Sequence, residues 1–435
     1  MSAPRARQLS ARSLIDASDP GIGILINTPT GHEPDCSGLS AVSTEATEDF
    51  TAPSTRADMT QPAAAGPLVT WAVDGESRSA RWRTANERPM PVRVEVVDDS
   101  LTADDANRMA SQGVAMLWLG DFHNARQILN ALDRRLGGGK RKTAASPADG
   151  FYRHRQSRSH RARILGMLLV PLNPGPVVPL RRSPDLRAAA QEAYGEISEP
   201  SVVSLHELVG AIGAHEWRRN GVPVAALQAR IHPHYGTFFP TRSEYVDLVA
   251  LAPLPATTVA FDIGTGTGVL AAVLARRGVQ RVIATDNEPR AISCAAANFT
   301  TLGVQEQAEA ILGDMFPAGR APLVVCNPPW IPATPHSSLD SAVYDPGSRM
   351  LHRFLSELPD HLDPGGEGWL VLSDLAEHLG LRTRLELLEA ISAAGLTVLD
   401  RLDTKPTHAK ASDPNDPLFA ARSAEVTSLW RLAAT

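Results

Sequence analysis

Four consecutive residues in the second half of the chain are of the types needed to act on a planar nitrogen. They are Asn327, Pro328, Pro329 and Trp330, and they directly follow an apolar run that predicts a buried strand. The lone pair of an amide or exocyclic amino nitrogen is delocalised into a π system, which makes it a poor nucleophile. Acceptors that bind both of its N–H protons favour a geometry nearer sp3. The Asn327 side-chain oxygen and the Pro328 carbonyl are candidates for these acceptors.

The residues around this asparagine suit the same chemistry. Pro328 and Pro329 fix φ and hold the loop stiffly. Trp330 offers a flat face on which a planar amide or base can stack. The alternative is an Asn-Pro-Pro turn that ends a strand and places a tryptophan in the core, so the assignment depends on what precedes the motif in the chain.

A glycine-rich loop earlier in the chain predicts a nucleotide site. Asp262 stands in a predicted strand, and the loop that follows opens a helix at Val269. Its glycines are Gly264, Gly266 and Gly268. Glycine lets the backbone turn tightly and approach a ligand closely, while the free N–H groups at a helix start favour polar contacts. Asp286 ends the next predicted strand and can accept hydrogen bonds from ribose hydroxyls. Asp314 follows the third strand, where an adenine amino group would lie.

The spacing of these glycines distinguishes two kinds of nucleotide site. A dinucleotide-binding Rossmann domain carries GxGxxG, whereas here Gly268 follows directly after Thr267. The acid Asp262 ahead of the first glycine is also foreign to the dinucleotide pattern. The loop instead resembles motif I of the class I methyltransferases, in which that acid helps to orient the methionine part of the cofactor. A glycine turn without a ligand is the alternative interpretation.

Residues 240–435 resemble the N-methyltransferases that carry an Asn/Asp-Pro-Pro-aromatic motif, the small-domain methyltransferases. Within them, the release-factor glutamine methyltransferase group is the most similar in its pattern. That group has a Pro-Arg-x-x-Thr-Glu element before motif I, and this chain has a similar run from Phe239 to Glu244 in which the arginine, Arg242, is displaced by one position. The group's motif ends in tyrosine, where this chain has Trp330. The resemblance implies S-adenosyl-L-methionine as the cofactor.

The residues expected at each part of the site follow from these motifs and the resemblance. The expected cofactor-binding residues are Asp262, Gly264, Thr265, Gly266, Gly268, Asp286, Asn287, Asp314 and Asn327. The expected catalytic residues are Asn327, Pro328, Pro329 and Trp330. The expected substrate-side residues are Tyr235 and Phe238 in a candidate lid, Arg242, and Arg349 in the 345–349 loop.

The second half of the chain alternates short apolar strands with helices, which predicts an α/β fold. The expected strands are Val259–Ile263, 282–285, Ala308–Leu312, 323–326 and 369–372, followed by a reversed hairpin of 396–400 and 426–432. The helices between them are clearest at 269–277 and 289–298. This order builds a doubly wound, Rossmann-like sheet of seven strands covered on both faces. The loop from Lys405 to Phe419 is unusually long and is expected to shape the substrate mouth.

The chain before this domain divides into two parts. Residues 1–66 are rich in Ala, Ser, Thr, Pro and Asp and are expected to be a disordered extension. Residues 67–220 are expected to form a mainly helical α+β domain for substrate recognition or an accessory role. A strand at 92–97 and helices opening near Thr102 and Asp121 are its clearest elements. The methyltransferase domain is expected over 221–435.

Composition limits the partners and the compartment. Cys36, Cys294 and Cys326 are the three cysteines, and they lie far apart, which suits a reducing cytoplasm and excludes a cysteine zinc site. There is no apolar run long enough for a membrane span. His232 and His234 have no clear third ligand, so no metal is expected.

One basic stretch offers a candidate contact with RNA. From Lys140 to Arg163, eight basic residues stand against a single acid, although the net charge of the chain is −6. Arg155, Arg158 and Arg161 would lie on or near one face of a helix there. Solvated surface charge is the alternative interpretation.

Three hypotheses for function remain open after the sequence alone. The first is N-methylation of a macromolecule, either a protein glutamine or a base in RNA or DNA. The second is N-methylation of a small molecule in specialised metabolism. The third is a catalytically silent cofactor-binding scaffold, against which the intact motif residues argue, notably Asp262, Asp286 and Asn327.

Overall fold

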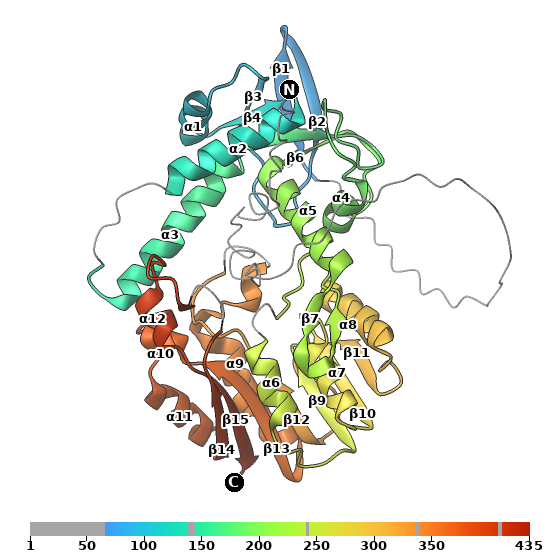
Figure 1. The fold of residues 1–435 in the computed structure, drawn as a ribbon, viewed down its shortest axis with the longest axis vertical. Coiled ribbons are helices and arrows are strands. Elements are labelled where there is room, and N and C mark those ends of the chain that lie inside the picture. Colours follow the sequence, from blue (N-terminus) through green and yellow to red (C-terminus); the bar gives the residue numbers. More distant parts are fainter. Residues whose placement is uncertain (1–65, 138–143, 241–242, 336–338, 408–410) are drawn as a thin grey trace, which may run out of the picture.

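A computed structural model describes residues 66–137, 144–240, 243–335, 339–407 and 411–435 (Figure 1). In these ranges the chain forms a first half built on one sheet and a second half built on a larger sheet. Two long helices, α3 and α5, extend from the first half toward the second in Figure 1. The expected disordered extension at 1–66 lies, except for its last residue, outside the described residues.

The first half is built on a six-stranded mixed sheet with the order β1-β2-β6-β5-β4-β3. Its strands are β1 Leu68–Val73, β2 Glu76–Trp82, β3 Arg93–Val97, β4 Val114–Trp118, β5 Leu168–Leu172 and β6 Ser201–Ser204. Helices hold more of the described residues of this half than strands do, in keeping with the expected mainly helical α+β domain, but a sheet of this extent was not expected. The strand near 92–97 was expected, but β1 and β2 form a hairpin that carries several charged residues and gives little apolar alternation.

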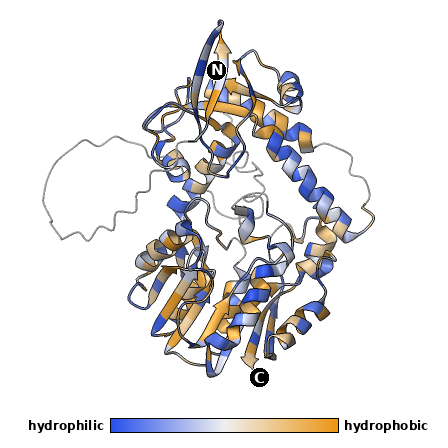
Figure 2. Ribbon diagram, turned by 180° about the vertical axis from the view of Figure 1, so that it is seen from behind, coloured by the Kyte–Doolittle hydropathy of each residue, from blue (hydrophilic) through white to orange (hydrophobic). Residues whose placement is uncertain are grey.

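Five helices accompany this sheet, and several begin at a side chain that caps them. They are α1 Ala103–Ser111, α2 Phe122–Gly137, α3 Pro147–Leu165, α4 Arg187–Tyr194 and α5 Leu205–Asn220. The Thr102 side chain accepts a hydrogen bond from the Asp105 backbone, and Ser146 and Ser204 cap α3 and α5 in the same way. Helix α3 is hydrophilic along most of its length (Figure 2).

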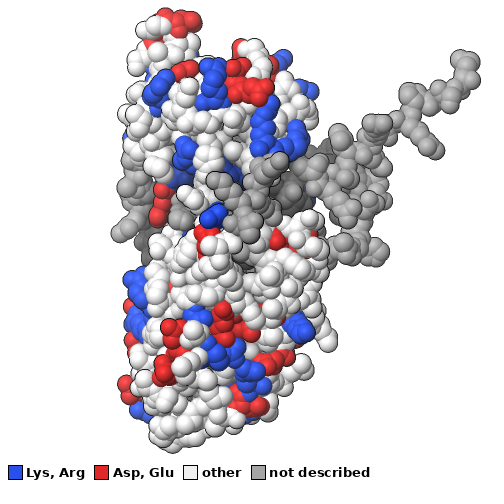
Figure 3. Space-filling view, turned by 90° about the vertical axis from the view of Figure 1, so that its left-hand side faces the viewer, with Lys and Arg blue, Asp and Glu red and all other residues white. Residues whose placement is uncertain are grey.

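The surface on the α3 side carries charges of both signs. On the face drawn in Figure 3, Lys and Arg residues are interspersed with Asp and Glu over both halves of the molecule. None of the helices that the structure describes is long and apolar enough to cross a membrane.

A short two-stranded sheet joins the two halves. Strands β7 Val222–Val224 and β8 Ala229–Ile231 pair in antiparallel fashion around the 3-10 turn Ala225–Leu227. The side chains of Val222, Val224, Leu227 and Ile231 are buried in the core of the second half. This segment therefore packs as part of the second half.

The second half is a seven-stranded sheet with the order β11-β10-β9-β12-β13-β15-β14. Its strands are β9 Val259–Ile263, β10 Arg281–Asp286, β11 Ala308–Leu312, β12 Ala321–Cys326, β13 Leu362–Ser373, β14 Leu396–Thr404 and β15 Thr427–Ala434. Neighbouring strands from β11 to β13 run parallel, while β15 is antiparallel to both β13 and β14. The expected α/β fold and its reversed C-terminal hairpin are thus present.

Helices cover both faces of this sheet. On one face lie α6 Glu244–Leu251, α7 Val269–Arg276 and α8 Pro289–Leu302, and on the other lie α9 Arg349–His361 and α11 Arg384–Ala393. The short helices α10 Leu375–His378 and α12 Phe419–Ala424 pack with Phe151 of α3 in a separate cluster. The single turns Leu339–Ala342 and Pro346–Ser348 precede α9. Helix α12 was not expected, because the sequence from 405 onward indicated only a long loop.

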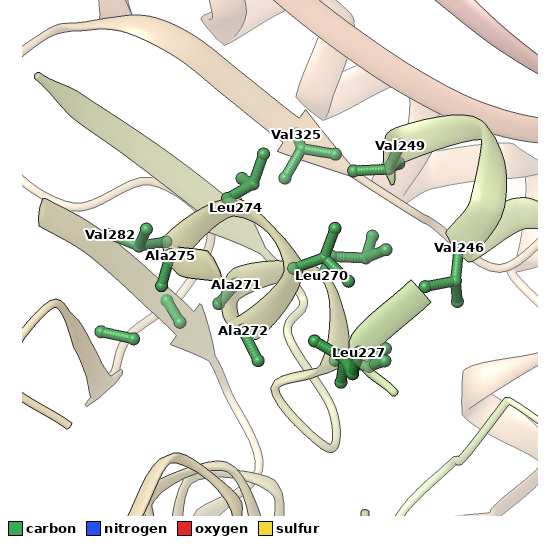
Figure 4. Packing of buried hydrophobic residues seen from close by; sticks show 14 of the residues in the cluster. Leu227, Val246, Val249, Leu270, Ala271, Ala272, Leu274, Ala275, Val282 and Val325 are labelled. Atoms are coloured by element: carbon green, nitrogen blue, oxygen red, sulfur yellow. The ribbon is translucent and has the colours of Figure 1, made fainter. Parts of the chain in front are cut away.

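Alternate side chains of each central strand enter two separate cores, as the period of a strand requires. In β12, Leu323 and Val325 pack with α6, α7 and α8, while Val324 and Cys326 pack with α9 and α11. Figure 4 shows the first of these cores, in which Leu270 and Leu274 of α7 meet Val325 and α6. This burial on both faces fixes the ends of the strands, and the site lies at their carboxyl ends.

Candidate active site

A cavity of about 710 Å³ lies at the carboxyl ends of β9, β10 and β12. This is the edge of a doubly wound sheet at which ligands bind. Eight of the nine expected cofactor residues line it, namely Asp262, Gly264, Thr265, Gly266, Asp286, Asn287, Asp314 and Asn327. Gly268 is the exception.

The glycine loop is fixed by hydrogen bonds to the neighbouring strand. The backbone N–H groups of Gly264 and Thr265 both donate to the Thr285 carbonyl at 2.9 Å. Gly268 has a φ of 79°, and a Cβ there would lie 2.6 Å from the Phe299 ring. Gly268 therefore lets α7 and α8 approach each other closely behind the loop, and this packing role explains why it does not line the cavity.

Asp262 is an almost fully buried carboxylate at the centre of the site, 1% exposed. One of its oxygens, Oδ2, accepts hydrogen bonds from the Thr265 hydroxyl at 2.6 Å and from the Ala271 backbone at 3.1 Å. Burial raises the pKa of Asp262 to about 6, and the nearby Asp286 adds to that rise. A cationic group in the cavity would favour its charged form.

Asp286 holds the other side of the glycine loop. Its Oδ2 accepts from the Gly266 backbone at 2.9 Å, and its Oδ1 accepts from the Glu288 backbone at 3.0 Å. Burial raises the pKa of this carboxyl as well. Each oxygen of a carboxylate has two lone pairs, so both can still accept from a ligand hydroxyl.

Asp314 has a different environment from the one expected. Its side chain is 71% exposed and forms an ion pair with Arg353 of α9 at 2.6 Å. Arg353 itself lines the cavity and was not predicted from the sequence, because α9 follows much later in the chain. The adenine contact expected of Asp314 would therefore share this carboxylate with an arginine.

The Asn-Pro-Pro-Trp motif directly follows β12. Asn327 and Pro329 line the cavity, while Pro328 is buried. The Trp330 indole N–H donates to Asn327 Oδ1 at 2.8 Å. The Trp330 ring meets Tyr245 edge-on at 6.3 Å and packs against apolar clusters, so in this conformation it lies behind Asn327 and away from the cavity wall.

Of the four expected substrate-side residues, two line the cavity. Phe238 and Arg349 line the cavity. Tyr235 is 4% exposed and packs against Ala193 and Ala211 of the first half, so it does not line the cavity. Arg242 lies outside the described residues.

The first half of the chain contributes three residues to the cavity wall that sequence reasoning missed. Ala85, Asn86 and Glu87 line it from the loop after β2. No local pattern marks them, since they carry no motif and reach the site only through tertiary packing. A second contact between the halves is made by α3, whose Arg155 guanidinium lies 4.0 Å from the centre of the Tyr344 ring.

Two arginines of the basic stretch that lie on α3 are engaged within the protein. Arg155 is 8% exposed, donates to the Thr334 carbonyl and lies 4.0 Å from Asp340. Arg161 forms an ion pair with Asp133 of α2. The helix expected there is present as α3, and Arg155 and Arg161 on it are held by protein groups, which lessens their use for phosphate. Lys140, Arg141 and Lys142 lie outside the described residues.

No group of three or more metal-ligating side chains is present among the described residues. The two histidines that the sequence places close together have other contacts. The Nδ1 atom of His232 lies 2.7 Å from the Arg218 carbonyl oxygen, and the backbone N–H of His234 donates to Cys294 Sγ at 3.3 Å.

Comparison with known proteins assigns the class that the sheet and the glycine loop indicate. The family model of the methyltransferase small domain matches residues 247–394. A release factor glutamine methyltransferase of Xylella fastidiosa strain 9a5c is 31% identical over 218 residues, which covers 43% of this chain and 76% of that protein. The chain belongs to the class I S-adenosylmethionine-dependent methyltransferases, in the methyltransferase small domain family.

Two further relatives show the range of this similarity. The release factor glutamine methyltransferase of Cereibacter sphaeroides is 34% identical over 176 residues, which is 37% of this chain and 62% of that protein. A ribosomal protein L11 methyltransferase of Pelotomaculum thermopropionicum is 35% identical over 144 residues, which is 32% of this chain and 39% of that protein. The match thus spans less than two thirds of the length of either of these two relatives.

Proposed function

We propose that this chain is an S-adenosylmethionine-dependent N-methyltransferase whose acceptor is a planar nitrogen of a macromolecule, with the side-chain amide of a protein glutamine as the first candidate. The observation that carries the proposal is the placement of Asn327 on the wall of the cavity that also contains the glycine loop. The names of the relatives, which include release factor glutamine methyltransferases, support a protein acceptor.

The residues of the cavity fit this cofactor. Asp286 offers acceptors to ribose hydroxyls, and Asp262 offers a buried carboxylate to a cationic amino group. The glycine loop at 264–268 contains three glycines with positive φ, so the backbone turns tightly and no side chain of these glycines takes up the space of a ligand. When bound, the cofactor supplies an electrophilic methyl group on a sulfonium.

Asn327 acts on the acceptor nitrogen in this proposal. The indole of Trp330 occupies one lone pair of Asn327 Oδ1 and holds the amide in one orientation. The second lone pair remains to accept a hydrogen bond from the acceptor N–H. The Pro328 carbonyl is the proposed second acceptor. Together they draw electron density toward the nitrogen and favour the geometry in which its lone pair can attack.

The contacts between the two halves support a role for the first half in placing the acceptor. We propose residues 67–220 as the recognition or accessory domain and 221–435 as the methyltransferase domain. Residues 85–87 reach the cavity wall, and α3 contacts Tyr344, which pairs with Ile331 directly after the catalytic motif.

The test is transfer of a labelled methyl group from S-adenosylmethionine into fractionated cell extract. The label is expected in the protein fraction, and protease treatment is expected to release it into small peptides. Asn327→Ala is expected to abolish transfer while cofactor affinity stays within a few-fold. Asn124→Ala is the matched control, because Asn124 is half-exposed on α2, away from the cavity wall, and its side chain bonds Asp99 of the same half. Label only in RNA, or only in a low-mass fraction, would contradict the protein acceptor.

A further inference from the structure

The loop from Thr84 to Arg88, here the 84–88 loop, belongs to the first half but forms part of the cavity wall. Ala85, Asn86 and Glu87 line the cavity alongside the glycine loop and Asp286. These residues lie far from the methyltransferase domain in the sequence. Their presence at the site means that the cavity is completed by both halves of the chain.

The buried carboxylate of Glu207 on α5 anchors this loop. Glu207 is 1% exposed and accepts hydrogen bonds from the Thr84 hydroxyl at 2.9 Å and from the Ala85 backbone at 2.7 Å. The Thr84 hydroxyl oxygen in turn accepts from the backbone N–H groups of Asn86 at 3.3 Å and Arg88 at 3.1 Å. The loop is therefore fixed before any ligand binds.

Further contacts fix the end of the loop. The Arg88 guanidinium lies 3.7 Å from Glu207 and donates to the Ala162 carbonyl of α3 at 3.0 Å. The Trp82 indole donates to the Arg88 carbonyl at 3.0 Å. Glu87 has a φ of 55°, a left-handed conformation that is unfavourable for a residue other than glycine and persists where the surroundings enforce it.

Asn86 has one polar atom for which the described residues supply no partner. The side chain is 6% exposed, and its Nδ2 donates to Glu207 at 3.4 Å and to the Tyr235 hydroxyl at 3.3 Å. Its Oδ1 is buried and accepts no hydrogen bond within the described ranges. A buried acceptor without a donor is unfavourable, so the position suits a ligand that brings an N–H or O–H group.

The surroundings of Asn86 lead to the cofactor part of the cavity. Tyr235, which Asn86 contacts, immediately precedes residues 236–238, which also line the cavity. The Phe238 carbonyl would lie 3.5 Å from a Cβ on Gly266, and the Gly266 N–H bonds Asp286. The loop is thus connected, through this segment, to the turn that would contact the cofactor.

We propose that Asn86 is a cofactor-binding residue supplied by the first half of the chain, whose Oδ1 accepts a hydrogen bond from S-adenosylmethionine. The inference rests on the proposed function and extends its cofactor site to both halves. The donors available on this cofactor are its ammonium group, ribose hydroxyls and adenine amino group. Glu207 is the positioning residue, because it holds the Asn86 side chain and the loop backbone together.

The test is the affinity of the full chain for S-adenosylmethionine, measured by calorimetry without any methyl acceptor. Asn86→Ala is expected to bind about 3- to 10-fold more weakly than the unchanged protein, the range for one lost hydrogen bond. Asn124→Ala, the same change at a half-exposed site of the same half that does not line the cavity, is expected to bind normally. Equal affinity of Asn86→Ala and the unchanged protein would overturn the proposal, as would a change confined to the KM of the acceptor.

A measurement on the unchanged protein covers the case in which Asn86→Ala does not fold. Hydrogen exchange of the 84–88 loop is expected to slow when S-adenosylmethionine is added, together with that of the glycine loop at 264–268. Slowing at 264–268 alone would refute the role of Asn86 and leave the proposed function intact. Slowing at neither segment, with no binding heat, would refute the proposed function itself.

Discussion

The buried carboxylate of Asp262 gives the most quantitative prediction. Its pKa is raised to about 6 by burial, so the carboxylate changes charge within an accessible pH range. The proposed cofactor site has this group facing a cationic ligand. We expect the affinity for S-adenosylmethionine to fall as the pH is lowered through about 6, because the protonated carboxyl cannot balance the charge of the ligand.

The size of the effect follows from the ionised fraction. With a pKa of about 6, nearly all molecules carry the charged carboxylate at about pH 7.5, and about one in ten does at about pH 5. If only the charged form binds well, the dissociation constant rises about tenfold between these two values. The assay is calorimetric titration of the full chain with S-adenosylmethionine at a series of pH values.

The stability of the free protein should change in the opposite direction. The folded-state pKa of Asp262 lies above its ordinary value of 3.8, so the folded state binds this proton more tightly than the unfolded state. The contribution of this group to stability is therefore present below about pH 3.8 and is lost as the pH rises through about 6. Because the affinity for the cofactor is expected to be higher above pH 6, the rise in Tm that the cofactor causes should also be larger there.

The control is Asp262→Asn, which keeps the shape of the side chain and cannot ionise. This variant should bind S-adenosylmethionine weakly and with little dependence on pH. The reasoning is refuted if the unchanged protein binds equally well at about pH 5 and 7.5. It is also refuted if Asp262→Asn keeps the full pH dependence, which would assign the effect to another group such as Asp286, whose pKa is also raised by burial.

Three further substitutions test the contacts that position the site. Arg155→Ala removes the contact with Tyr344 and should lower the free energy of unfolding by about 2 kcal/mol in chemical denaturation, while the KM of the acceptor rises and cofactor affinity stays unchanged. Gly268→Ala places a methyl group against Phe299 in a left-handed backbone position, and calorimetry should show cofactor affinity reduced at least tenfold. Phe354→Ala leaves a cavity in the core beneath α9 and should cost about 3–5 kcal/mol of stability, with the residual cofactor affinity of the folded fraction unchanged. Normal stability in the first or last variant, or normal affinity in the second, would contradict the packing described.

Local patterns in the sequence predicted the methyltransferase sheet well. The bounds of β9 and β11 agree with the expected ones, because each is a short apolar run closed at both ends by polar or turn residues. The acids and glycines of the cofactor site were also predictable, since their spacing follows from the order of strand, turn and helix. Predictions were therefore good wherever neighbouring residues determine the structure.

The sheet of the first half was less predictable from the sequence. Strand β2 has the sequence ESRSARW, with three charged residues in seven, and strand β6 has only four residues. These strands are stabilised by pairing with partners far along the chain, as when Arg81 of β2 pairs with Ser201 of β6. Such pairing leaves little trace in a local pattern.

The parts of the candidate site that depend on tertiary contacts were also missed. Asn86 reaches the cavity only because Glu207, more than a hundred residues later, binds its loop. Arg353 reaches Asp314 only through the packing of α9. The indole of Trp330 bonds Asn327, whereas its residue type alone suggested a stacking platform facing the substrate. In each case the position of the side chain depends on tertiary packing, which no local pattern of the sequence shows.

The measurement that tests the central claim most directly is identification of the methylated atom. The full chain is incubated with isotopically labelled S-adenosylmethionine and cell extract, and the labelled product is digested and sequenced by mass spectrometry. The account predicts a methyl group on the side-chain nitrogen of a glutamine, present with the unchanged protein and with Asn124→Ala and absent with Asn327→Ala. A methyl group on carbon, oxygen or sulfur, or transfer that persists in Asn327→Ala, would contradict it.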